Sequence, residues 1–158
     1  MSKILPILKT PSPLLRRKSG EIKKEKILEK KFQNFCSDMT KTMKEKDGVG
    51  LAAPQVGEDI RLIVINEKNG PLCMINPKII KKSLLKEWDE EGCLSVPGIY
   101  GKVKRNKNLS CEYLDKEGKK NKIKANGLLA RVIQHEIDHL DGILFIDKAK
   151  DIHEIERL

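Results

Sequence analysis

The pentapeptide His135-Glu136-Ile137-Asp138-His139 lies in a stretch, residues 127–140, whose apolar spacing predicts an α-helix. Residues four positions apart share one face of a helix, so His135 and His139 can bind a single metal ion with Glu136 beside it. The chain contains three histidines, and two of them fall at this spacing around a glutamate. We therefore expect a metal-binding helix and a fold that holds it in place.

The predicted helix has one face for a site and another for packing, at about 100° per residue. The site face carries Leu128, Val132, His135 and His139. The packing face carries Leu129, Ile133, Ile137 and Leu140. Glu136 lies between the two faces, and the polar far side carries Arg131, Gln134, Asp138 and Asp141. One face is therefore expected to pack on a sheet while the other lines a site.

The rest of the chain predicts an extended arm, one more long helix and several short strands. Three prolines interrupt the first 19 residues. Apolar residues at steps of three or four predict a helix over 23–46, namely Leu28, Phe32, Phe35, Met39 and Met43. β-Branched runs predict strands at 61–66, 72–75, 78–82, 102–105, 109–114, 119–124 and 143–146. No linker or repeat divides the chain, so residues 1–158 are expected to form a single α+β domain. Its antiparallel strands would pack around the central metal-binding helix.

Composition narrows the class of protein. No apolar run approaches the roughly 18 residues of a membrane span. Lys3, Pro6 and Lys9 interrupt the N-terminal segment, which makes a poor signal peptide. Four cysteines are too few for a disulfide scaffold. We therefore expect a cytoplasmic protein with reduced thiols and no membrane partner.

The net charge of +9 suggests a polyanionic neighbour such as ribosomal RNA, although a Lys-rich proteome would also produce it. Basic groups are concentrated in residues 1–46 and 102–124, whereas acidic groups predominate in residues 134–158. Aromatic residues make up 4% of the chain, so we expect no platform for base stacking and no recognition of a specific nucleic acid sequence. Any docking on the ribosome would use the two basic regions and not the tail, 152–158.

Two other segments are rich in glycine and carry polar residues. Residues 48–55 read GVGLAAPQ and residues 91–97 read EGCLSVP. Read alone, the first could be a tight turn and the second a strand with a buried thiol. Together with QHEIDH at 134–139, and in this order, they resemble the three signature motifs of peptide deformylases. The resemblance extends from residue 48 to residue 142 and implies the α+β fold of that family.

The resemblance also implies a ligand set and a reaction. Cys93, His135 and His139 would bind the metal ion, and a water molecule would complete a tetrahedron. A thiolate with two imidazoles suits Fe(II), Zn(II), Ni(II) or Co(II), and Fe(II) is the preference of the family. Deformylases remove the formyl group from the N-terminal formyl-methionine of newly made polypeptides and release formate. The formyl-methionyl nascent peptide is therefore the expected partner.

The catalytic roles follow from the same resemblance. Glu136 would take a proton from the metal-bound water and pass it to the departing amine. The side-chain amide of Gln55 and the backbone N–H of Leu94 would stabilise the oxyanion.

The substrate-binding residues are expected on two segments. Gly48 and Gly50 would let the peptide approach the backbone closely. An apolar pocket for the methionine side chain would be lined by Val49, Leu128 and Val132, with Arg131 at its rim. Glu91 is expected to pair with Arg105 behind the site.

Two alternatives remain open from the sequence. A zinc endopeptidase could use the same HExxH motif, but it would leave Cys93 without a task. A basic, non-catalytic factor bound to the ribosome could hold a structural metal, but it would need a fourth protein ligand. Cys36, Cys73 and Cys111 match no motif, nor does His153, and all four are expected to have no role in the site.

Overall fold

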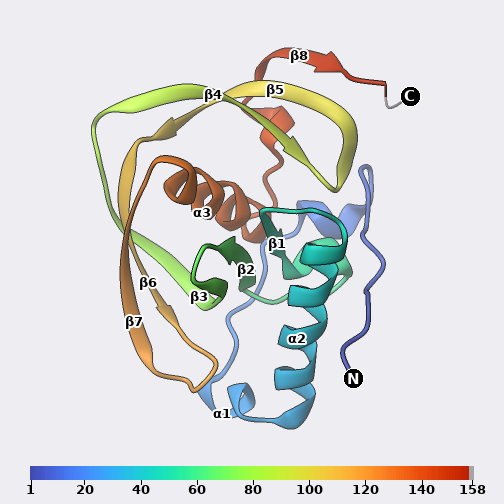
Figure 1. Cartoon of the computed structure of the whole chain (residues 1–158), viewed down its shortest axis with the longest axis vertical. Coiled ribbons are helices and arrows are strands. Elements are labelled where there is room, and N and C mark those ends of the chain that lie inside the picture. Colours follow the sequence, from blue (N-terminus) through green and yellow to red (C-terminus); the bar gives the residue numbers. More distant parts are fainter. Residues whose placement is uncertain (157–158) are drawn as a thin grey trace.

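Two antiparallel sheets surround one helix, α3, in the computed structural model, which describes residues 1–156 (Figure 1). Its elements follow in the order η1 (Pro13–Arg16), α1 (Lys24–Ile27), α2 (Lys30–Glu45), β1 (Gly50–Ala52), η2 (Ala53–Val56), β2 (Leu62–Glu67), β3 (Gly70–Lys82), β4 (Lys86–Cys93), β5 (Val96–Asn106), β6 (Asn108–Leu114), β7 (Lys120–Asn126), α3 (Gly127–Leu140), η3 (Phe145–Asp147) and β8 (Lys150–Glu154). One sheet has the strand order β1-β2-β3-β6-β7, and the other has the order β4-β5-β8. Every strand pair in the two sheets is antiparallel, so the expected α+β class is confirmed. No helix among residues 1–156 combines the length and the apolar character required to cross a membrane.

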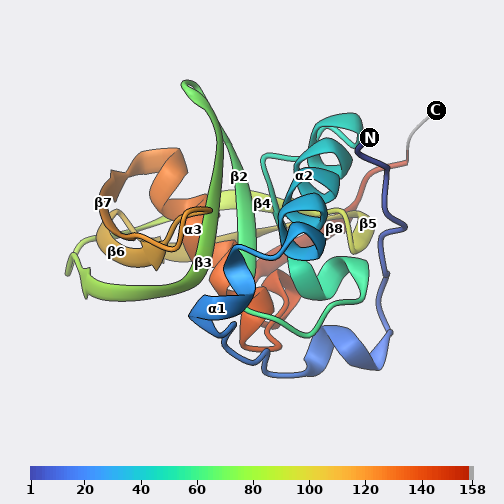
Figure 2. The same cartoon turned by 90° about the horizontal axis from the view of Figure 1, so that it is seen from below.

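Strand β2 has an apolar side chain on each face because a helix covers each face. Ile63 and Ile65 belong to the core cluster that includes α3. Leu62 and Val64 belong to the cluster formed with α2. Figure 2 shows β2 and β3 passing between α2 and α3. The uninterrupted apolar run of this strand therefore reflects burial on both sides.

Strand β3 replaces the two strands expected at 72–75 and 78–82. Its pairing with β6 is irregular between Ile75 and Lys78, where Asn76 adopts a positive φ of 51°. The Asn76 side chain accepts a hydrogen bond from the Ile22 N–H at 2.8 Å and donates one to the Ile22 carbonyl at 2.9 Å. Asparagine tolerates the left-handed conformation, so the strand bends here without ending.

The second sheet contains two strands that the sequence pattern did not predict. Strand β4 is highly charged and forms by pairing with β5 from Lys86 opposite Asn106 to Gly92 opposite Tyr100. Strand β8 pairs with the other edge of β5. The strand expected at 143–146 is wrong: the chain forms η3 there, and the Asp147 carboxylate accepts a hydrogen bond from the Leu144 N–H at 3.0 Å.

The long helix expected at 23–46 is broken into α1 and α2. Leu28, which was expected in the buried stripe, is 69% exposed at the break. The Gln33 side chain donates a hydrogen bond to the Ile27 carbonyl at 2.6 Å and so stabilises the interruption. Met39 and Met43 on α2 are fully buried, as expected from their spacing.

The N-terminal arm runs along the elements that carry the three motifs. The Leu8 N–H donates a hydrogen bond to the Gln55 carbonyl at 2.7 Å, and the Thr10 N–H donates one to the Ser95 carbonyl at 2.9 Å. The Ser19 N–H then reaches the Leu140 carbonyl at the end of α3. The arm therefore joins three distant parts of the chain.

Substitution of Gly142 tests how closely this arm packs against the end of α3. A Cβ at Gly142 would lie 2.5 Å from the Arg16 carbonyl oxygen, and its φ is +75°. Gly142→Ala should lower the free energy of unfolding in urea by about 3 kcal/mol, from backbone strain plus the collision. Gly118→Ala is the matched control, because its φ is +78° but its nearest neighbour is a lysine side-chain carbon at 3.7 Å. Equal losses in the two variants would contradict the proposed collision.

Candidate metal centre

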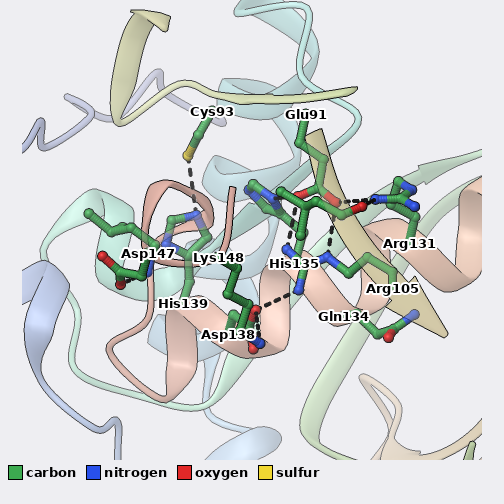
Figure 3. A network of polar contacts seen from close by, with 12 residues as sticks. Glu91, Cys93, Arg105, Arg131, Gln134, His135, Asp138, His139, Asp147 and Lys148 are labelled. Atoms are coloured by element: carbon green, nitrogen blue, oxygen red, sulfur yellow. Dashed lines mark hydrogen bonds and ion pairs between the residues drawn. The ribbon is translucent and has the colours of Figure 1, made fainter. Parts of the chain in front are cut away.

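Three side chains from two elements meet beside α3. Cys93 ends β4, whereas His135 and His139 lie one turn apart on α3 (Figure 3). One ligand atom of each residue lies within 4.8 Å of those of the other two. The Cys93 Sγ and His139 Nε2 atoms are 3.2 Å apart. The structure thus brings together the three residues expected to bind a metal.

The chemistry of these donors fits a divalent transition metal. A tetrahedral ion with bonds of about 2.3 Å to sulfur and about 2.0 Å to nitrogen holds those two atoms about 3.5 Å apart. The Nδ1 atom of His135 is hydrogen bonded to Glu91 Oε1 at 2.8 Å, which leaves Nε2 available as a ligand. Burial is the main cause that holds the pKa of His139 well below its usual value, and this favours the neutral ring that metals bind.

Glu136 lies beside the three donors and is buried. Its Oε2 atom has no hydrogen-bond partner among residues 1–156, which is rare for a buried carboxylate oxygen. Burial is the main cause that raises the pKa of Glu136 to about 7, against the opposing charge of His135. A Cβ on Gly50 would lie 2.8 Å from Glu136 Oε1, so the glycine allows β1 to pass this carboxylate closely.

Glu91 anchors the back of the site through four charge-assisted hydrogen bonds. Arg105 donates two of them, at 2.8 and 2.9 Å, which confirms the expected pair. Arg131 donates one at 2.7 Å, and His135 lies at 2.8 Å. Burial alone would raise the pKa of Glu91, but the hydrogen bonds and charges of Arg105 and His135 outweigh it and lower the pKa well below its ordinary value.

Arg131 corrects an expectation about the substrate pocket. It was expected at the rim of the methionine pocket, but it is 7% exposed and also donates to the Val103 and Glu87 carbonyls. The guanidinium turns inward because Glu91 and two backbone oxygens supply acceptors there. Gln134, expected on the same polar far side, is likewise buried and bonds the Asn106 backbone.

Gln55 is held close to the Cys93 sulfur. Its Oε1 accepts a hydrogen bond from the Ala52 N–H at 3.0 Å, which fixes the orientation of the amide. Its Nε2 lies 3.0 Å from Ser95 Oγ and 3.5 Å from Cys93 Sγ. Leu94 follows Cys93 directly, and its side chain would lie 3.1 Å from a Cβ on Gly48. The first two motifs are therefore in contact.

The three residues expected to line the apolar pocket differ in their exposure. Val132 is buried against Gly50, where a Cβ would lie 2.9 Å from Val132 Cγ1. Val49 and Leu128 are 55% and 69% exposed, so they offer apolar surface to a ligand.

Two side chains at the site were missed by sequence reasoning. Ser95 is fully buried and bonds the Gln55 amide; its place within the second motif was the available signal. Phe145 stacks on His135 with ring centroids 6.1 Å apart, and nothing in the local pattern pointed to it. Among residues 1–156, the metal-binding group includes none of the other three cysteines, and His153 pairs with Glu90 on the surface.

The Glu91 carboxylate should contribute strongly to the free energy of unfolding, because it pairs with buried side chains behind the metal centre. Glu91→Gln should lower the free energy of unfolding by about 3 kcal/mol at neutral pH, because it leaves buried arginine charge uncompensated. Since the folded pKa of Glu91 is depressed, this stabilisation is complete above its unfolded pKa of about 4.3 and is lost as the pH falls below that value. Denaturant titrations at neutral and acidic pH measure it.

The control for this prediction is Glu90→Gln. The Glu90 side chain is 51% exposed and pairs with His153, so its loss should cost less than about 0.5 kcal/mol. A Glu91→Gln variant as stable as this control would show that the cluster contributes nothing.

Comparisons with known proteins agree on one family. The model of the polypeptide deformylase family matches residues 4–154. A peptide deformylase of Dictyoglomus thermophilum is 47% identical over 143 residues, which cover 90% of this chain and 91% of that protein. One of Desulforudis audaxviator is 43% identical and covers 95% of this chain and 96% of that protein.

Solved structures give the same result. A class I type b peptide deformylase from Acinetobacter baumannii superposes with a TM-score of 0.91 at 34% identity, covering 93% of this chain and all of that one. A peptide deformylase from Synechococcus elongatus, in complex with actinonin, has a TM-score of 0.88 at 40% identity, covering 93% of this chain and 79% of that one. The zinc endopeptidase considered from the sequence finds no support in these relatives. The chain therefore belongs to the polypeptide deformylase family.

Proposed function

We propose that Cys93, His135 and His139 bind one divalent metal ion and that the chain uses it to hydrolyse the formyl group of N-terminal formyl-methionine. The observation that carries this proposal is the meeting of three donor atoms within 4.8 Å beside the buried Glu136. The products are formate and a polypeptide with a free amine. The donor set suits Fe(II), Zn(II), Ni(II) and Co(II), and Fe(II) is proposed from the preference of the family.

A metal ion held by Cys93, His135 and His139 would lower the pKa of a water molecule and would polarise the formyl oxygen. Glu136 would take a proton at its carboxylate from the water that attacks the formyl carbon, and it would deliver that proton to the amine nitrogen as the C–N bond breaks. Its raised pKa, about 7, supports this exchange, because a general base works best near the operating pH. Burial excludes competing water from the carboxylate.

The oxyanion is held by two N–H donors. The Gln55 amide is fixed by Ala52 and Ser95, and its Nε2 faces the Cys93 sulfur. Such prior fixing costs no reorganisation when charge develops. We assign the second donor to the backbone N–H of Leu94, which follows Cys93.

The substrate lies along the first motif. Gly48, Val49 and Gly50 offer a backbone that a peptide can approach, and the Val49 side chain is 55% exposed there. The methionine side chain contacts Val132 and the exposed Leu128. Arg131 is omitted from the pocket because its guanidinium is committed to Glu91.

Ribosome docking through a basic surface is part of the proposal, because the substrate is made there. The tail, 152–158, is not proposed as an anchor, and its residues 157 and 158 lie outside the described part of the chain. Residues 152–154 belong to β8, which pairs with β5, and the Lys150 Nζ atom lies 3.9 Å from the centroid of the Trp88 ring. These contacts support a role for β8 within the sheet. We also propose that the protein acts in the cytoplasm, because newly made formyl-methionyl polypeptides are its proposed substrate.

The general base is tested by Glu136→Gln. This variant should retain its metal and lose at least about 100-fold in kcat, because the glutamine amide cannot take the proton. Formate release from a formyl-Met peptide measures turnover, and elemental analysis measures metal content. A metal-loaded variant with near-normal kcat would rule out the assignment.

The thiolate ligand is tested by Cys93→Ala. Loss of one of three protein ligands should abolish stoichiometric metal binding and activity together. Cys111→Ala is the control, because Cys111 is buried in β6 and belongs to the core rather than to the metal group. Full metal content in Cys93→Ala, by elemental analysis of protein purified without oxygen, would refute the ligand set.

A further inference from the structure

A second concave site lies on another face of α3. It has a volume of about 400 Å³ and is walled by β3 on one side and by β4 and β5 on the other. Gln134, Ile137 and Asp138 of α3 form its floor. Figure 3 shows Gln134 and Asp138 on the side of α3 away from Cys93. This basic cleft is therefore separate from the metal centre.

The charge in the cleft is strongly unbalanced. Seven basic side chains line it against two acidic ones, Asp138 and Asp141. Both acidic groups are already neutralised: Asp138 by Arg105 and Lys148, and Asp141 by Arg61. Their partners therefore contribute little net attraction for a ligand.

Four lysines remain. They come from both walls: Lys78 and Lys82 from β3, Lys86 from β4 and Lys104 from β5. None of them forms an ion pair within residues 1–156, and all four are exposed. Like charges gathered without counter-ions raise the local potential and attract an anion.

We propose that the basic cleft binds the phosphate backbone of RNA. Lysines on flexible stems neutralise phosphates as point charges and read no sequence. No aromatic side chain among the described residues lines the cleft, so stacked bases are not the ligand. A concave site with lysines on opposite walls fits a phosphate ridge, whereas a flat bilayer would reach one rim only.

The inference rests on the proposed function, because a nascent-chain substrate places the protein beside ribosomal RNA. It also changes the expected docking surface. Lys78, Lys82 and Lys86 lie outside the basic regions 1–46 and 102–124 that the sequence singled out. The strands bring them together with Lys104.

The test compares two triple variants with equal loss of charge. K78Q/K82Q/K86Q removes the cleft lysines, and K23Q/K26Q/K31Q removes exposed lysines of the N-terminal basic region. Anisotropy of a short fluorescein-labelled RNA duplex is followed from about 50 to about 200 mM KCl. The cleft variant should bind at least about tenfold more weakly, and its salt slope should fall by about one per lysine removed. The control should bind RNA like the unmodified chain.

Three results would overturn the proposal. The first is a cleft variant that binds RNA as tightly as the unmodified chain. The second is a control variant that loses RNA binding instead. The third is an unmodified chain that binds phosphatidylserine vesicles and does not bind RNA. If the triple variant fails to fold, K82Q and K86Q alone should each lower the salt slope by about one. Hydrolysis of a short formyl-Met peptide is measured alongside and should be equal in all variants. If the unmodified chain does not hydrolyse this peptide, the proposed function is refuted. The RNA-binding measurement still decides whether the basic cleft binds RNA.

Discussion

The buried carboxylate of Glu91 is the constraint on which the site depends. Glu91 comes from β4, Arg105 from β5, and Arg131 and His135 from α3, so one cluster joins the second sheet to the helix. A buried charge without partners would cost several kcal/mol, which forces these elements into one arrangement. The hydrogen bond between Glu91 and His135 Nδ1 also orients the His135 ring toward the metal centre.

Strong local patterns allowed part of the fold to be predicted. The apolar run of β2 and the amphipathic spacing of α3 are local signals, and both elements formed where expected. Strand β4 has no apolar alternation, because most of its side chains are exposed and its stability comes from pairing along β5. The break between α1 and α2 depends on Gln33 bonding the Ile27 and Lys116 carbonyls, the second of them remote in sequence.

The candidate site could likewise be predicted only where local sequence motifs identified its residues. Its motifs identified Cys93, His135 and His139, which the fold brings together. A helical wheel gives the face of a residue but not the neighbour that the face meets, so Arg131 was expected at the pocket rim and its pairing with Glu91 was not predicted. Phe145 could not be predicted, because it reaches His135 from a turn after α3.

The N-terminal arm has a consequence for the order in which the chain can fold. Leu8 is bonded to Gln55, Thr10 to Ser95 and Ser19 to Leu140, so this segment has partners as far along the chain as residue 140. Synthesis proceeds from the N-terminus, and contacts between distant residues form slowly. During synthesis the hydrogen bond from Ser19 to Leu140 therefore cannot form until α3 has left the ribosomal tunnel. An enzyme of nascent chains would thus complete its own site only after its helix α3 has been made.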